Sequence, residues 1–224
     1  MNDEKKRATD SDVFRFVAVS IVFMLLLNVV TSLFVKGWTG AGANTALVSL
    51  MYLVYAVRAK NAMLTHFLVL ALVAGWVELA ADWWLVTKTE SLVYAEGPKI
   101  VESPIYMPFA WMLILVQVGL VGQWLQRRLP TWLAALLTGA FAGLNIPSYE
   151  SLAKFAEWWI YRDTPMILNA PYYIILGEFL IGVPLVFMGL WHAKDPKVHF
   201  AVLLGVVEGL VIWLAYWIAW GLVG

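Results

Sequence analysis

The chain has 224 residues, of which 62% are hydrophobic and 13% are charged, and its formal net charge is zero. Soluble proteins carry about 25% charged residues, so this composition indicates an integral membrane protein. The zero net charge argues against nucleic acid as a partner. The chain has no cysteine, which excludes a disulfide framework, a thiolate nucleophile and an iron–sulfur site.

The first twelve residues are polar and are followed by a long apolar run. We expect residues 1–12 to be a cytoplasmic tail, because they are too polar for the apolar part of a signal peptide. Residues 13–224 are expected to form a single transmembrane domain. An apolar stretch of about 20 residues crosses the hydrocarbon, and seven candidates follow the tail: 13–35, 44–57, 62–86, 104–125, 131–161, 171–191 and 198–222.

Three local features qualify these spans. Asn28 is the one amide side chain of the first span, and we expect it to make an interhelical hydrogen bond. Residues 36–44 are rich in glycine, which predicts a turn between the first two spans. The fifth candidate is too long for one straight helix, and Pro147 inside it predicts a kink or break. We find no domain boundary and no convincing internal repeat.

Lysine and arginine predict the orientation of these spans. Cations gather in the segments that include Arg58, Lys60, Arg127 and Arg128, whereas fewer lie in the alternate loops. The positive-inside rule therefore places the N-terminus inside and the C-terminus outside. We expect the protein in the cytoplasmic membrane of a bacterium or archaeon.

Carboxylates are the most informative residues of this apolar chain. Glu78 and Asp82 are four residues apart on the third span, so they share one helical face. An ionisable group at the centre of a membrane helix costs roughly 2.5 to 3.5 kcal/mol. Glu78 is therefore expected to serve a function, whereas for Asp82 a purely interfacial role remains equally open.

Other polar residues are predicted at a similar depth. Asn145, Tyr149 and Glu150 lie on the fifth span, Glu178 lies about two turns into the sixth, and Glu208 lies near the middle of the seventh. Together they predict a polar pocket in the outer half of the bundle. The charged loop 87–103 is either a lid over this pocket or a solvated connector, and the sequence leaves both readings open.

The residue types limit the chemistry of such a pocket. The chain has no Walker, Rossmann or zinc-protease motif, and we expect no cofactor. Its histidines lie far from the carboxylates along the predicted spans, which argues against a mixed histidine–carboxylate metal centre, whereas a metal site made of carboxylates alone stays open. A carboxylic acid buried among aromatic side chains can keep its proton and act as a general acid. If it protonates an alkene, aromatic faces can stabilise the carbocation by cation–π contact.

Several motifs carry a resemblance to a known family. Trp76-x-Glu78, Thr87, Tyr94, Gly97-Pro98-Lys99 and Pro104-x-x-x-Pro108-x-Ala110-Trp111 resemble the membrane-integral carotenoid-biosynthesis family, and Asn169-Ala170-Pro171 is similar to its second half. That family includes carotenoid 1',2'-hydratases and is similar to small membrane lycopene and terpenoid cyclases. The resemblance implies a cofactor-free enzyme that acts on a long isoprenoid, with Glu78 as the leading acid, Asp82 as a second candidate, and Trp76, Tyr94 and Trp111 near the substrate.

The sequence therefore predicts an all-α bundle of seven transmembrane helices that hydrates or cyclises a lipid-soluble isoprenoid. Glu78 is the expected proton donor, and Glu178 and Glu208 are expected to hold it protonated or to position water. Asn145, Tyr149 and Glu150 complete the substrate pocket. The alternative is a non-catalytic protein: an accessory subunit, a lipid or pigment carrier, or a proton-coupled transporter. Whether the chain forms a homo-oligomer or joins a larger membrane complex stays open.

Overall fold

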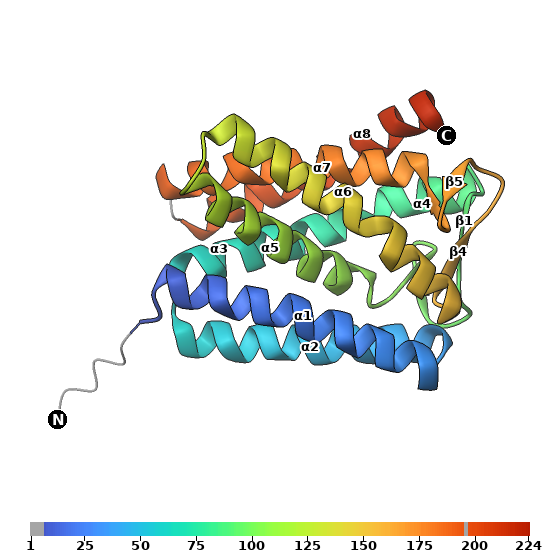
Figure 1. Ribbon diagram of the computed structural model, residues 1–224, viewed down its shortest axis with the longest axis horizontal. Coiled ribbons are helices and arrows are strands. Elements are labelled where there is room, and N and C mark those ends of the chain that lie inside the picture. Colours follow the sequence, from blue (N-terminus) through green and yellow to red (C-terminus); the bar gives the residue numbers. More distant parts are fainter. Residues whose placement is uncertain (1–6, 195–196) are drawn as a thin grey trace.

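The computed structural model describes residues 7–194 and 197–224. Its helices lie side by side along the long axis of the molecule (Figure 1): α1 (Asp10–Phe34), α2 (Gly37–Ala59), α3 (Ala62–Val77), α4 (Leu79–Thr87), α5 (Met107–Gln126), α6 (Thr131–Phe155), α7 (Tyr172–Lys194) and α8 (Val198–Val223). Counting α3 and α4 as one, six of the described helices are long and apolar enough to cross a membrane, and α6 is not among them. The fold is an all-α membrane bundle, as the composition predicted.

The predicted tail is only partly described, because residues 1–6 lie outside the described residues. Helix α1 begins at Asp10, inside the segment that was expected to be a tail. The Thr9 hydroxyl accepts a hydrogen bond from the Asp12 backbone, and the Asp12 carboxylate accepts one from the Thr9 backbone at 2.9 Å. This reciprocal capping box fixes the start of the helix.

The predicted glycine-rich turn at residues 36–44 is wrong, because Gly37 begins helix α2. The chain turns between the helices at Gly37, whose φ is +70°. Gly40 then packs so closely that an added Cβ would lie 2.0 Å from the Val35 carbonyl oxygen. Further along α2, the Asn44 amide donates to Asn28 Oδ1 at 2.9 Å, which confirms the interhelical bond predicted for Asn28.

Of the kink or break predicted at Pro147, the break is wrong, because α6 continues through this proline to Phe155. A proline removes one backbone donor but leaves the bonds of the flanking turns in place. Helix α6 packs along α7, and Gly143 approaches α7 closely enough that a Cβ would lie 2.7 Å from the Ile175 carbonyl oxygen. This packing supports the helix where the sequence alone predicts a kink.

Short strands cover the end of the bundle that lies opposite the N-terminus (Figure 1). They are β1 (Leu92–Tyr94), β2 (Lys99–Ile100), β3 (Ser103–Pro104), β4 (Trp159–Tyr161), β5 (Met166–Ile167) and β6 (Ala170–Pro171). Strand β1 pairs with β4, β2 with β3, and β5 with β6, all antiparallel. The loop 87–103 is therefore tied by β1 to the chain that follows α6.

The strands reveal an internal repeat, so the expectation that the chain has none was wrong. Each of β4, β5 and β6 begins 67 residues after its counterpart β1, β2 and β3. The β2–β3 and β5–β6 hairpins have the same register, and both residues of each two-residue turn have positive φ. Backbone bonds repeat too: Ala95 N–H donates to the Trp158 carbonyl, and 67 residues later Arg162 N–H donates to the Ser91 carbonyl, each at 2.9 Å.

This repeat relates two halves of the bundle by an approximate two-fold axis. The first half runs from α3 through α5 and the second comprises α6, its strands and α7. In the β1–β4 ladder, Leu92 pairs with Tyr161 and Tyr94 pairs with Trp159, so the axis passes near the central pair of Val93 and Ile160. The remaining helices lie outside the repeat: α1 and α2 pack on α5 and α6, whereas α8 packs on α3 and α7.

Candidate functional site

A cavity of about 70 Å³ lies between the two halves, near the strand-bearing end. Five pairs of residues that the repeat relates line it: Asp82 and Tyr149, Leu92 and Trp159, Tyr94 and Tyr161, Met107 and Ile174, and Trp111 and Glu178. The cavity therefore lies on the approximate two-fold axis. Repeated membrane proteins commonly place their substrate sites at the interface between repeats.

Asp82 on α4 is held by the loop that covers the cavity. The Tyr94 hydroxyl donates to Asp82 Oδ2 at 2.6 Å, and the Ser103 hydroxyl donates to the same oxygen at 2.7 Å. Asp82 is buried and lines the cavity. The loop thus contacts the carboxyl group directly, which supports the lid reading of residues 87–103.

Glu78 lies one helical turn before Asp82, at the junction of α3 and α4. It is completely buried, and neither of its carboxyl oxygens has a hydrogen-bond donor among the described residues. The Asp82 carboxyl and the Trp111 indole are its polar neighbours. Glu78 does not line the cavity itself, so it can influence a bound molecule only through these neighbours.

Glu150 and Glu178 line the cavity from α6 and α7. Each accepts one hydrogen bond from an aromatic side chain: Trp159 Nε1 donates to Glu150 Oε2 at 2.6 Å, and the Tyr216 hydroxyl donates to Glu178 Oε1 at 2.8 Å. Glu178 lies within electrostatic range of Glu78 and Glu150. It is therefore the central member of the carboxyl group cluster.

Glu208 on α8 is the fifth member of this carboxyl cluster, which comprises Glu78, Asp82, Glu150, Glu178 and Glu208. It is completely buried next to Glu178, does not line the cavity, and has no hydrogen-bond partner for either oxygen among the described residues. An ionised carboxylate buried without a partner costs several kcal/mol. Glu208 in its neutral form avoids this cost.

The cluster has no cationic counterpart in the described part of the chain. The salt bridges found there join Lys36 to Glu157 and Arg127 to Asp10, away from the five carboxyl groups. The described residues also contain no group of three or more histidine, aspartate or glutamate side chains arranged to hold a metal ion. The hydrogen-bond donors to the cluster among the described residues are therefore neutral side chains: Tyr94, Ser103, Trp159 and Tyr216.

Aromatic side chains complete the wall. Burial, followed by the nearby Asp82 charge, raises the pKa of the Tyr94 phenol well above its usual range. Burial, followed by the nearby Glu150 charge, does the same for the pKa of Tyr161. Both phenols therefore stay protonated and remain hydrogen-bond donors. Trp111 and Tyr216, which also line the cavity, pack edge to face with ring centroids 6.3 Å apart.

Most of the predicted site residues converge, but two do not. Trp76 is 46% exposed on the outside of α3, because two residues correspond to about 200° around a helix from Glu78. Asn145 is exposed on α6, whereas Tyr149 and Glu150 on the next turn reach the cavity. These two residues are therefore placed on the surface that faces away from the cluster.

The sequence reading missed four residues of the site: Ser103, Trp159, Tyr161 and Tyr216. Trp159 and Tyr161 alternate as on a strand, and Tyr216 follows Glu208 by about two helical turns, so periodicity could have indicated these three. Ser103 lies in the charged loop, and its contact with Asp82 depends on the β2–β3 hairpin. No sequence pattern predicts that contact.

A family model described as a domain of unknown function, DUF6989, matches residues 79–223. The match includes four members of the carboxyl cluster, begins directly after Glu78, and leaves α1, α2 and α3 outside. Comparisons with curated proteins and with solved structures gave no significant match. Because the matched range covers more than half of the chain, the protein belongs to the DUF6989 family.

Proposed function

We propose that the chain is a cofactor-free membrane enzyme that protonates an alkene of a lipid-soluble isoprenoid, such as an acyclic carotenoid. The observation that carries this proposal is Asp82, which lines an aromatic cavity while two hydroxyl groups hold one of its oxygens. The resemblance of the segment from Trp76 to Trp111 to carotenoid hydratases and membrane cyclases supports the same chemistry.

Asp82 replaces Glu78 as the proposed proton donor, because Asp82 reaches the cavity. Its Oδ2 accepts the Tyr94 and Ser103 hydroxyl hydrogens, so Oδ1 is the oxygen that carries the proton. Glu78 stays neutral beside it, since two adjacent carboxyl groups in a dry site resist ionising together. When Asp82 gives up its proton, the Tyr94 and Ser103 hydroxyls stabilise the new carboxylate.

The proton forms a C–H bond at one alkene carbon and leaves a carbocation at the other. The faces of Trp111, Tyr149 and Trp159 line the cavity and can stabilise this charge by cation–π contact. The cation then loses a proton directly, adds to a second alkene to close a ring and form a new cation that loses a proton, or captures water to form an oxonium ion that loses a proton. In each case the proton returns to the Asp82 carboxylate formed in the first step. Glu178, held by Tyr216, is the proposed water-positioning group.

Entry of a substrate requires part of the wall to move. A volume of about 70 Å³ holds a few water molecules rather than an isoprenoid. Ala110, Ile114, Tyr149 and Trp159 separate the cavity from a second pocket beside α1 and α2. Movement of these side chains joins the two spaces, and this is the proposed route for the isoprenoid chain.

The test is deuterium incorporation from heavy water by the purified full chain supplied with an acyclic carotenoid in detergent. Active protein should place one deuterium on the product, and Asp82→Asn should lower the rate by roughly 10²- to 10⁴-fold, as expected for loss of a general acid. Asp163→Asn, in an exposed loop, is the matched control and should keep the rate. Normal turnover by folded Asp82→Asn would refute the proposed role.

We also propose that the chain crosses the membrane seven times, with its N-terminus inside. Helix α6 is the proposed seventh crossing, because it packs along α7 and its ends coincide with those of its neighbours (Figure 1). The chain has no cysteine, so single cysteines can be introduced at Lys60 and Glu96 without a background. A membrane-impermeant maleimide added to intact cells should label the cysteine at Glu96 and not the one at Lys60, and the reverse pattern would overturn the orientation.

One observation favours a second candidate, a proton-coupled transporter. Carriers built from repeats place acidic residues and substrate at the repeat interface, and the carboxyl cluster lies between the two repeated halves. Carotenoid-dependent proton flux in liposomes, without chemical change of the carotenoid, would establish this function in place of the enzyme. Product formation without flux would exclude it.

A further inference from the structure

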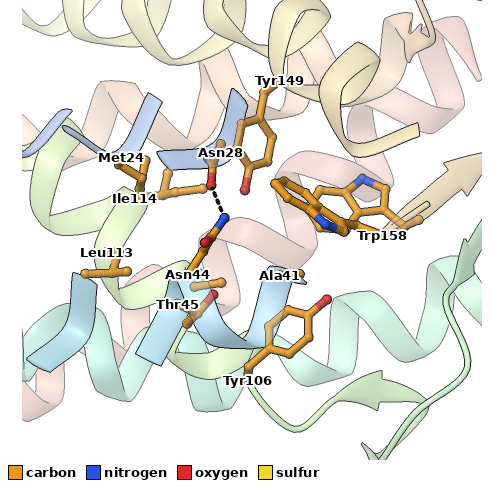
Figure 2. Close-up of a pocket in the computed structure, with 12 residues that line it drawn as sticks. Met24, Asn28, Ala41, Asn44, Thr45, Tyr106, Leu113, Ile114, Tyr149 and Trp158 are labelled. Atoms are coloured by element: carbon orange, nitrogen blue, oxygen red, sulfur yellow. Dashed lines mark hydrogen bonds between the residues drawn. The ribbon is translucent and has the colours of Figure 1, made fainter. Parts of the chain in front are cut away.

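A second pocket, of about 30 Å³, lies between the peripheral helices α1 and α2 and the helices α5 and α6 (Figure 2). Its polar wall consists of Asn28, Asn44, Thr45, Tyr106 and Tyr149, together with the Trp158 indole. Asn44 and Asn28 are hydrogen-bonded to each other, and Figure 2 shows Tyr149 and Tyr106 on opposite sides of that pair. Among the described residues, none that lines this pocket has a charged side chain.

Two buried donors at this pocket have no partner among the described residues. The Tyr106 side chain is 6% exposed and the Trp158 side chain 1%, yet neither the Tyr106 hydroxyl nor Trp158 Nε1 makes a hydrogen bond. Burial raises the pKa of the Tyr106 phenol above its usual range, so it keeps its proton. An unsatisfied buried donor is costly, and a ligand oxygen in this pocket would supply an acceptor that the described residues do not.

The internal repeat provides a comparison within the same chain. Tyr173 and Ser91 are the counterparts of Tyr106 and Trp158, 67 residues apart in each case. On that side the two hydroxyls are hydrogen-bonded to each other at 2.8 Å, and the Tyr173 ring packs on Trp220 with centroids 4.8 Å apart. At the equivalent position beside α2, the Tyr106 hydroxyl and Trp158 Nε1 have no partner among the described residues, and a pocket lies next to them.

We propose that this pocket binds an uncharged oxygen group at the end of the isoprenoid, with Tyr106 and Trp158 as donors to that oxygen. The absence of charge in the lining favours an alcohol or carbonyl over a phosphate or carboxylate, since a charged head group would be buried without a counter-ion. The oxygen group anchors the isoprenoid, and the isoprenoid's carbon skeleton extends past Ile114 and Tyr149 toward Asp82. This inference rests on the proposed function in one respect: the ligand is taken to be an isoprenoid.

The test compares two probes that differ by one oxygen: tritiated geranylgeraniol and its deoxy hydrocarbon, bound to the purified full chain in detergent. Tyr106→Phe should weaken binding of the alcohol by roughly 2- to 12-fold, the effect of one hydrogen bond, and should leave binding of the hydrocarbon unchanged. Tyr173→Phe is the matched control, because it removes the same hydroxyl from the other half, and it should change neither affinity. Without ligand, Tyr106→Phe should be at least as stable as the unaltered chain, since the lost hydroxyl has no partner.

Equal binding of alcohol and hydrocarbon by the unaltered chain, or an unchanged alcohol affinity in folded Tyr106→Phe, would show that the pocket holds only water. Failure to bind either probe would also overturn the site. The Asp82→Asn chain separates this inference from the proposed enzyme. If that variant and the unaltered chain both bind the alcohol through Tyr106 but neither protonates it, the binding site stands and the proposed function fails. If deuterium incorporation depends on Asp82 but the alcohol and the hydrocarbon bind equally, the proposed function stands and the binding site fails.

Discussion

Replacement of Tyr94 by phenylalanine tests whether the loop 87–103 stabilises the Asp82 carboxylate that forms when Asp82 loses its proton. The change keeps the ring that packs edge to face on Trp159, with centroids 6.2 Å apart, and removes one of the two donors to Asp82 Oδ2. A hydrogen bond to a neutral acceptor contributes about 0.5 to 1.5 kcal/mol, and one to a charged acceptor about 1.5 to 3 kcal/mol. The difference of roughly 1 to 1.5 kcal/mol is the stabilisation gained only as Asp82 ionises.

This difference corresponds to a decrease in kcat of roughly 5- to 13-fold, with a smaller change in KM. The proposed function requires Asp82 to be neutral in the resting protein. The free energy of unfolding, measured by reversible denaturation in mixed micelles, should therefore fall by only about 0.5 to 1.5 kcal/mol. Tyr55→Phe is the control: Tyr55 stacks on Phe16 in the α1–α2 pair, with centroids 3.8 Å apart. A loss of about 3 kcal/mol in stability with unchanged kcat would mean that Asp82 is already ionised at rest, and the reasoning would fail.

Two further predictions concern packing and surface charge. Gly75→Ala should destabilise the bundle by about 1 to 3 kcal/mol, since its Cβ would lie 2.3 Å from the Pro108 carbonyl oxygen at the contact of α3 with α5. Gly221→Ala, which has no atom within 4 Å of an added Cβ, should be neutral or stabilising, and equal unfolding midpoints for the two variants would contradict the packing. Lys36→Ala removes an exposed ion pair with Glu157 and should change the unfolding free energy by less than about 1 kcal/mol; a larger loss would show that this pair is not simply solvated.

Segments that form helices were predictable because their signal is local. An apolar run of sufficient length is a property of consecutive residues, and the expected spans correspond to the observed helices to within a few residues at most ends. The exceptions are instructive. Glycine was read as a turn signal at Gly40, but it serves close packing there, and Pro147 was read as a break although α6 is continuous.

Depth and composition also predicted that carboxylates from separate helices meet. Glu78, Asp82, Glu150, Glu178 and Glu208 do form one buried cluster. The sequence did not determine which of them reaches the cavity, because two residues four positions apart on one helical face can still differ in what packs against them. Asp82 lines the cavity and Glu78 lies behind it.

The chain's own sequence thus determined its membrane character, its helices and the approximate depth of its acidic residues, because hydrophobic length and residue spacing act along the chain. Tertiary structure alone decided the rest. The repeat has a trace in the sequence, because Tyr94, Pro98, Pro104 and Tyr106 recur 67 residues later as Tyr161, Pro165, Pro171 and Tyr173. It was recognised only from the backbone geometry that its hairpins share. Likewise, Ser103 contacts Asp82, and Tyr106 lacks the partner that Tyr173 has, only because segments distant in sequence pack together.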